Sequence, residues 1–121
     1  MIVDLLGVPE SRFEVFFKPE NWCMMDSFLC ELMERERIQI LNKQVHFFDG
    51  PVGAMTCLYL LSESHFSIHT FPEENGRIAM DLFTCGNNDV EHILLQIIVF
   101  LAPANYIIEF IDREREDALQ S

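Results

Sequence analysis

The sequence predicts a single α/β domain of the α+β type, in which two helices cover one face of a mainly antiparallel sheet. The 121 residues suffice for one compact domain and not for two. Apolar segments of strand length follow one another between residues 38 and 84, and short turns join them. Strands joined in this way pair antiparallel. Two segments with helical spacing can cover only one face, so we expect a two-layer sandwich whose open face dimerises.

The first half of the chain predicts a strand, a helix and a second strand. Residues 13–18 (FEVFFK) are apolar and aromatic and precede a proline, which is typical of a strand. Asn21 is a candidate helix cap. Apolar residues then recur at helical spacing as far as the charged segment MERER: Trp22, Met25, Leu29 and Leu32. Residues 38–48 alternate roughly between apolar and polar, which favours a strand, and they end at an Asp-Gly-Pro turn.

The middle of the chain predicts a central strand followed by a hairpin. Residues 54–61 are almost continuously apolar, which indicates a strand that is buried on both faces or lies centrally in the sheet. Residues 65–71 and 77–84 are strand-like, and the polar run PEENG (72–76) between them is typical of a hairpin loop.

The C-terminal part predicts a helix and a last strand. The turn Gly86-Asn87-Asn88 supplies a helix cap, and residues 90–101 form a helix that ends before Pro103. One face of this helix is apolar: Ile93, Leu94, Ile97, Ile98 and Leu101. Residues 105–111 predict a strand, which a charged tail follows.

Composition excludes several classes of protein. The formal net charge of −12 argues against a nucleic-acid partner, which requires clustered Lys and Arg. It favours a cationic substrate, although acidic surfaces also serve solubility. The longest apolar stretch, residues 93–104, is shorter than the roughly 18 residues of a membrane span, and no secretion signal is visible. The four cysteines form no C-x-x-C pair, so we expect a cytoplasmic protein with reduced thiols.

Residue types that carry chemistry gather in the predicted hairpin: the segment SESH (62–65), then His69, Glu73, Asp81 and Cys85. A metal site is one interpretation, with His65, His69 and Cys85 as ligands. On a strand, however, His65 and His69 lie about 13 Å apart, and both ligand nitrogens must lie about 2 Å from zinc. We therefore expect no metal. A second interpretation is that these are ordinary strand residues and that Cys85 is a small buried side chain.

A third interpretation is a reactive peptide bond opposite a thiol. If the hairpin loop centres on Glu74 and Asn75, antiparallel pairing places Ser64 opposite Cys85, with side chains about 5 Å apart. A register slip of two residues would remove this contact. His69 has the opposite parity to Ser64 and reaches it only through a bulge.

Two longer motifs favour the third interpretation. The strings LSESHFSIHTFPE (61–73) and DLFTCG (81–86) resemble the signature of the prokaryotic S-adenosylmethionine decarboxylases. These are pyruvoyl enzymes of similar length with a two-layer α/β fold. The resemblance is strong over residues 58–87, compatible in element order to the C-terminus, and poor over residues 1–50.

The resemblance implies that the chain cleaves itself. In such families the serine hydroxyl attacks the preceding carbonyl, here that of Glu63, and forms an ester. Elimination and hydrolysis then leave a β chain (1–63) and an α chain (64–121) whose first residue, Ser64, has become a pyruvoyl group. His69 matches the histidine that assists this processing as a general base. Thr56 is the nearest match to a Ser/Thr that polarises the reacting carbonyl.

The resemblance also implies roles in turnover. The substrate amine forms a Schiff base with the pyruvoyl carbonyl, which accepts electrons when carbon dioxide leaves. Cys85 matches the proton donor, because a thiol is mostly protonated at neutral pH. Glu73 resembles a carboxylate of the substrate pocket, and Phe47 or Phe48 is the expected adenine-stacking ring. The product, decarboxylated S-adenosylmethionine, would supply spermidine biosynthesis, and the active species would be a homodimer of processed units.

Three departures from the family pattern concern the substrate. Phe71 stands where the family commonly has Trp, the segment DGPVGAMT contains an apparent insertion, and the N-terminus lacks a Gly-x-His opening. Some relatives decarboxylate L-arginine or L-ornithine, which need no adenine site, so these substrates are the alternative. A catalytically dead dimer partner or regulator is a further alternative. Retention of Ser64, His69 and Cys85 argues against it.

Overall fold

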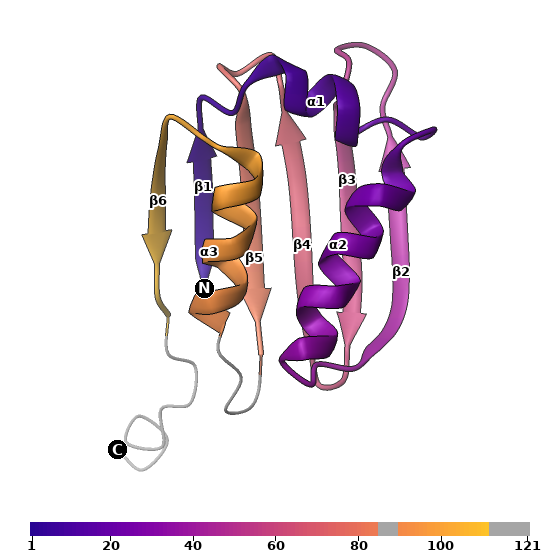
Figure 1. Ribbon diagram of the computed structural model, residues 1–121, viewed down its shortest axis with the longest axis vertical. Helices are drawn as coiled ribbons and strands as arrows, with labels where there is room; N and C mark the ends of the chain where they lie inside the picture. Colours follow the sequence, from indigo (N-terminus) through magenta and orange to yellow (C-terminus); the bar gives the residue numbers. More distant parts are fainter. Residues whose placement is uncertain (85–89, 112–121) are drawn as a thin grey trace, which may run out of the picture.

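The computed structural model describes residues 1–84 and 90–111, which form a six-stranded antiparallel sheet with helices on one face (Figure 1). The elements in chain order are β1 (Ile2–Leu6), α1 (Glu10–Phe16), α2 (Trp22–Arg35), β2 (Ile40–Phe47), β3 (Met55–Leu61), β4 (Ser64–Phe71), β5 (Arg77–Phe83), α3 (Val90–Leu101) and β6 (Asn105–Glu109). The strand order is β2-β3-β4-β5-β1-β6. The predicted fold class is confirmed, with three helices in place of the expected two.

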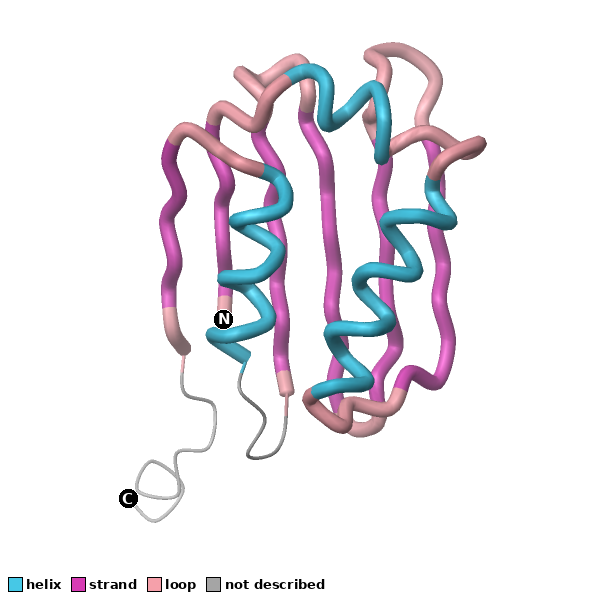
Figure 2. Tube along the Cα trace, in the orientation of Figure 1, coloured by secondary structure: helices cyan, strands magenta, loops and turns pink. Residues whose placement is uncertain are grey.

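The helices lie on a single face of the sheet, as Figure 2 shows. α2 lies over the β2–β3 side, α3 lies over the β1–β5 side, and the short α1 crosses one end of the strands (Figure 1). The predicted inward face of α3 is confirmed, because all five of its apolar residues are buried. Met25, Leu29 and Leu32 of α2 are buried as expected. No helix in the described part of the chain is long and apolar enough to cross a membrane.

The prediction of a strand at residues 13–18 is wrong, because these residues belong largely to α1. Phe13 and Phe17 are four residues apart and therefore share one helical face, where both are buried with their ring centroids 5.7 Å apart. A short run that is apolar at four of six positions fits a helix as well as a strand. Here the spacing of the two buried rings decides for the helix.

The first strand of the chain, β1, is not among the predicted elements. It pairs with β5 on one side and β6 on the other, and Val3 and Leu5 face the helices. Its five residues alternate correctly for a strand. The segment is simply too short to stand out, although it completes the sheet between two elements from the other end of the chain.

Of the two alternatives for residues 54–61, burial on both faces or a central position, the second holds, because β3 lies inside the sheet between β2 and β4. Its burial alternates: Met55, Cys57, Tyr59 and Leu61 face the helices and are buried, whereas Leu58 and Leu60 are exposed on the opposite face. The apolar residues of that second face belong to a surface that no helix of the described chain covers. β3 therefore separates a packed core from an open sheet face.

Candidate functional site

The Glu63–Ser64 bond lies in the tight turn between β3 and β4. Leu61 and Ser64 are paired across the hairpin, so Ser62 and Glu63 alone make the connection. Glu63 has a φ of 65°, a left-handed conformation that costs a non-glycine residue about 1 kcal/mol. The Ser64 hydroxyl is 3.5 Å from the Ser62 carbonyl oxygen, which is a weak contact. The residue that precedes the bond is thus strained, and among the described residues the Ser64 hydroxyl makes only this weak contact.

A polar cavity of about 310 Å³ adjoins this bond. The α2–β2 connection and the β3–β4 turn lie side by side there, and Ser62 N–H donates to the Gln39 carbonyl at 3.0 Å. The cavity is lined from both segments and from the end of β5: Arg37, Ile38, Gln39, Ser62, Glu63, Ser64 and Thr84. Ser64, the predicted pyruvoyl precursor, therefore borders a space that is open to small molecules.

The predicted processing residues Thr56 and His69 are brought together. They are direct cross-strand partners on β3 and β4, and Thr56 Oγ1 lies 3.0 Å from His69 Nδ1. Both side chains point to the sheet face that the helices leave open, the same face as Leu58 and Leu60. A hydroxyl that hydrogen-bonds an imidazole is an arrangement suited to proton transfer.

Ser64 and His69 are not brought together within the chain. β4 pairs without interruption on both sides, with no bulge between the two residues. Five residues of regular strand span about 16 Å, and an odd separation places the two side chains on opposite faces. The bulge that would join Ser64 to His69 is absent from the described strand.

The predicted register of the β4–β5 hairpin is wrong by one residue. The observed pairs, from His65↔Phe83 to Phe71↔Arg77, centre the loop on Glu74 alone. Continued by one pair, this register places Ser64 opposite Thr84, which agrees with the presence of Thr84 in the same cavity. Cys85, the predicted proton donor, lies outside the described residues, as does the predicted turn at 86–88.

The predicted substrate-binding residues lie at the opposite end of the sheet from Ser64. Glu73 follows β4 and lines a cavity of about 600 Å³, together with Glu10 and Glu14 of α1. Phe48 follows β2, is half exposed, and contacts the His46 ring edge-on at 4.7 Å. Phe71 lies under the Arg77 guanidinium at 5.1 Å. Because the eight residues of β4 span about 23 Å, none of these side chains reaches Ser64 of the same chain.

His65, on the open face, is engaged by two neighbours. Its Nε2 lies 3.3 Å from Asp81 Oδ2, and its ring stacks on Phe83 with centroids 5.9 Å apart. The described residues hold no group of three or more His, Cys, Asp or Glu arranged for a metal ion. His65 and His69 both lie on β4, so the spacing of residues along a strand applies to them.

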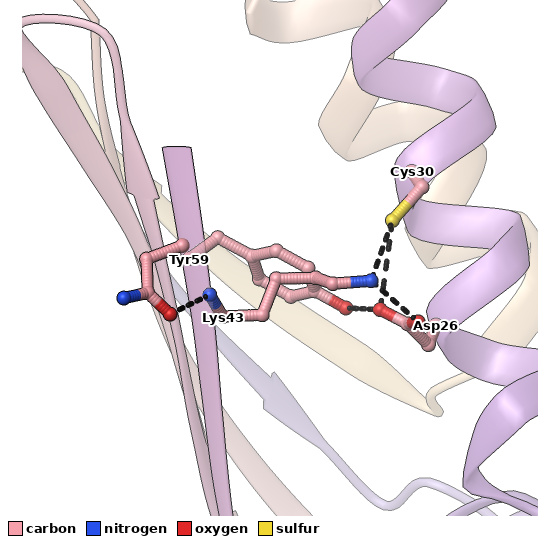
Figure 3. A network of polar contacts seen from close by, with 5 residues as sticks. Asp26, Cys30, Lys43 and Tyr59 are labelled. Atoms are coloured by element: carbon pink, nitrogen blue, oxygen red, sulfur yellow. Dashed lines mark hydrogen bonds and ion pairs between the residues drawn. The ribbon is translucent and has the colours of Figure 1, made fainter. Parts of the chain in front are cut away.

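A polar network on the covered face joins α2 to the sheet (Figure 3). Asp26 of α2 accepts hydrogen bonds from the Tyr59 hydroxyl at 2.6 Å and from Lys43 Nζ at 2.9 Å. The Cys30 thiol lies 3.5 Å from the same carboxylate. Burial alone would raise the pKa of Asp26, but the hydrogen bonds from Tyr59 and Lys43 outweigh it and leave the pKa below its usual value. The network anchors α2 on β2 and β3.

Two residues, Arg37 beside the cavity and Thr70 next to His69, are not among the predicted site residues. Arg37 belongs to the charged end of α2, where an arginine is expected on a solvated face. Thr70 lies in the HTFPE string, yet its hydroxyl is buried and bonded to the backbone of Gly53 and Met55. A polar residue at an inward-facing position of a strand is the signal that marks Thr70. Nothing in the sequence marks Arg37.

Comparison with known proteins agrees with the motifs. The S-adenosylmethionine decarboxylase family profile matches residues 2–114. The S-adenosylmethionine decarboxylase proenzyme 2 of Bacillus anthracis is 36% identical over 105 residues, which cover 87% of this chain and 78% of that protein. The arginine decarboxylase proenzyme of Hyperthermus butylicus is 39% identical over 91 residues, covering 74% of this chain and 63% of that protein.

The fold agrees as well. The solved structure of the adenosylmethionine decarboxylase from Aquifex aeolicus VF5 superposes with a TM-score of 0.67 at 22% identity, over 93% of each chain. At this identity the likeness bears on the fold alone. The sequence match, which spans nearly the whole chain, establishes more. This chain belongs to the S-adenosylmethionine decarboxylase family, whose members are pyruvoyl-dependent carboxy-lyases.

Proposed function

We propose that this protein is a self-processing decarboxylase that cleaves itself between Glu63 and Ser64 and acts on S-adenosylmethionine. The observation that carries the proposal is the position of this bond. It lies in a strained two-residue turn beside a cavity, within the family's own motif. Processing would yield chains 1–63 and 64–121. The pyruvoyl group formed from Ser64 would supply the electron-accepting carbonyl that the reaction needs.

Cleavage is chemistry of the chain's own residues. The Ser64 hydroxyl loses its proton and attacks the Glu63 carbonyl carbon, and the peptide C–N bond breaks to leave an ester. Removal of the Ser64 α-proton then expels the Glu63 carboxylate and leaves a dehydroalanine, whose hydrolysis releases ammonia. The left-handed turn at Glu63 favours the first step, because the intact peptide starts in a strained conformation.

The general base for this cleavage must come from a second copy of the chain if it is His69. Within one chain His69 and Ser64 lie about 16 Å apart on opposite faces of β4, so they cannot exchange a proton directly. The open face, which carries Thr56 and His69 together with exposed Leu58 and Leu60, is the surface on which a partner would pack. We therefore propose a homodimer packed through the open face, in which the partner supplies the Thr56–His69 pair. This requires the Ser64 hydroxyl, which starts on the covered face at the end of β4, to turn toward the open face.

The same separation bears on the substrate pocket. Glu73 and Phe48 lie at the far end of β4 and β2 from Ser64, so they too could serve only the partner's pyruvoyl group. Cys85 would donate the proton to carbon after decarboxylation, as the family motif implies. In the sequence it comes directly after Thr84, which lines the Ser64 cavity.

A second candidate substrate is L-arginine. The relative from Hyperthermus butylicus carries that activity in its name, and Phe71 stands where the family commonly has Trp. The Glu10, Glu14 and Glu73 carboxylates around the larger cavity would suit a guanidinium as well as a sulfonium. Both substrates are cationic amino acids, so the net charge of −12 does not separate them.

The proposal is tested first by mass. The purified protein should consist of residues 1–63 and 64–121, with the second fragment blocked to N-terminal sequencing, and Ser64→Ala should remain intact. A wild-type chain that stays whole contradicts the proposal. Release of labelled carbon dioxide from S-adenosylmethionine, arginine and ornithine, each offered in parallel, then identifies the substrate.

The dimer is tested by complementation. Ser64→Ala supplies an intact His69, and His69→Ala supplies an intact Ser64. Co-expressed, the two variants should yield split chains carrying the His69→Ala substitution, whereas each alone stays whole. Absence of splitting in a mixture that forms heterodimers would show that His69 acts within its own chain or not at all.

A further inference from the structure

The loop after α2 holds an arginine in a conformation that favours glycine. α2 ends in a Schellman arrangement, in which Arg37 N–H donates to the Glu34 carbonyl and Ile38 N–H donates to the Met33 carbonyl. This arrangement requires a left-handed backbone at the residue after the helix cap, which is Arg37, and its φ is 59°. Glycine is the usual residue there, because a Cβ makes this conformation unfavourable.

Arg37 also lines the cavity beside the Glu63–Ser64 bond. Ile38, the next residue, is buried and fixes the position of the loop, and Gln39 holds the β3–β4 turn through the Ser62 N–H. Arg35, two residues earlier, is paired with Glu31 at 2.8 Å. Arg37 makes no ion pair with any of the described residues, so its cation is available to a group that arises in the cavity.

Cleavage of the Glu63–Ser64 bond creates such a group. Before cleavage the Glu63 carbonyl belongs to an uncharged peptide. After elimination the same carbon is a carboxylate, and the only other charged side chain among the residues lining the cavity is that of Glu63 itself. Cleavage therefore adds a second negative charge beside the first, and the two repel each other unless a cation lies near.

We propose that Arg37 binds the carboxylate that self-cleavage generates at Glu63, and that it thereby speeds the elimination step and holds the new end of the β chain. This inference rests on the proposed self-cleavage. A guanidinium suits the task because it stays charged at all physiological pH values and can bind both carboxylate oxygens at once. The left-handed backbone at Arg37 is then strain retained at a functional position.

The test uses Arg37→Gly, which removes the cation and the backbone strain together. Splitting of the newly made chain is followed on denaturing gels after cell-free translation is stopped. We expect Arg37→Gly to split about fivefold more slowly than wild type, in line with the loss of one partly exposed ion pair. The ester intermediate of this variant should accumulate, and hydroxylamine, which cleaves esters, should split the chains that contain it. In the non-splitting Ser64→Ala background, Arg37→Gly should raise the melting temperature.

Two further variants separate this role from a general effect of charge or folding. Arg37→Lys keeps the cation and should split within about twofold of wild type. Arg35→Gln removes a neighbouring cation from the same helix end and should split at the wild-type rate. Added salt should slow the splitting of wild type, because salt screens the ion pair, and it should not slow the splitting of Arg37→Gly.

Several results would overturn the inference. One is splitting of Arg37→Gly at the wild-type rate; if the processed Arg37→Gly enzyme then has a raised KM, Arg37 belongs to substrate binding instead. Another is slowing of Arg35→Gln to the same extent as Arg37→Gly. A wild-type chain that never splits overturns the proposed function together with this inference. Unchanged splitting in Arg37→Gly overturns this inference alone.

Discussion

The Tyr59 hydroxyl donates a 2.6 Å hydrogen bond to Asp26 Oδ1, and this bond joins the central strand β3 to helix α2. Tyr59 is fully buried, and its ring stacks near Phe66 of β4 at a centroid distance of 6.1 Å. The strand that pairs with the Ser64 segment is thus fixed to the helix layer through one side chain. Asp26 and Tyr59 are 33 residues apart in the sequence, so the bond closes a large part of the fold.

Tyr59→Phe should lower the free energy of unfolding by about 2 kcal/mol, because it removes a hydrogen bond to a charged group while the ring stays packed. Urea unfolding in the Ser64→Ala background measures the effect without interference from chain cleavage. Tyr106→Phe is the matched control, since Tyr106 lies half exposed on the edge strand β6, and it should change stability by less than about 0.5 kcal/mol. Equal effects of the two substitutions would contradict a stabilising role for the Tyr59–Asp26 bond.

The Asp26 carboxylate makes the free energy of unfolding depend on pH. Burial disfavours the charged form of Asp26, yet the hydrogen bonds from Tyr59 and Lys43 hold its folded-state pKa below the ordinary value of 3.8. The contribution of Asp26 is therefore complete above about pH 4 and is lost as the pH falls through the lower folded-state pKa. Urea midpoints measured from pH 7 down to pH 3 should show a steeper acid loss for Ser64→Ala than for Ser64→Ala with Asp26→Asn. Equal acid profiles for the two proteins would contradict this role of Asp26.

The fold class and two helices follow from the sequence because their patterns have a single interpretation. In α3 the inward apolar residues recur at helical spacing over three turns, and all of them are buried. Residues 13–18 are apolar at four of six positions, and their spacing does not distinguish a strand from a helix. The buried faces of Phe13 and Phe17 exist only because α1 crosses the end of the sheet.

The site is less predictable than the fold, because it depends on register and on backbone conformation. A loop with an odd number of residues centres on one residue, and a loop with an even number centres between two. The observed odd loop, centred on Glu74, gives Ser64 the partner Thr84 in place of Cys85. The family motif identifies Ser64, whereas residue spacing alone does not. The left-handed angles of Arg37 and Glu63 have no sequence signal, because both positions carry residues that rarely adopt them.

The cysteines should differ in reactivity according to burial. Cys23 is exposed, whereas burial raises the pKa of the Cys57 thiol to about 12. Since the thiolate is the form that reacts, iodoacetamide at pH 8 should modify Cys23 in the folded Ser64→Ala protein and leave Cys57 unmodified. Peptide mass spectrometry reports both sites, and modification in urea shows that Cys57 can react once unfolded. Equal rates at the two thiols in the folded protein would mean that β3 opens readily.

The hydrogen bonds of Thr70 should both stabilise the sheet and hold Thr56 and His69 in position. The buried Thr70 hydroxyl donates to the Gly53 carbonyl at 2.5 Å and accepts from the Met55 N–H at 2.8 Å. Met55 precedes Thr56 on β3, and Thr70 follows His69 on β4, so these bonds fix the backbone of both strands next to the Thr56–His69 contact. Thr70→Val keeps the side-chain shape but leaves two buried backbone groups unpaired, at a cost of about 2–4 kcal/mol.

Thr70→Ser is the informative control, because it retains the hydroxyl and loses only a methyl group. In the Ser64→Ala background it should cost about 1 kcal/mol in urea unfolding, well below the cost of Thr70→Val. In the cleavable chain, Thr70→Val should split more slowly than wild type at a temperature where both remain folded, and Thr70→Ser should restore most of the rate. If Thr70→Val were destabilised as expected yet split at the wild-type rate, its hydroxyl would hold the sheet together without positioning Thr56 and His69.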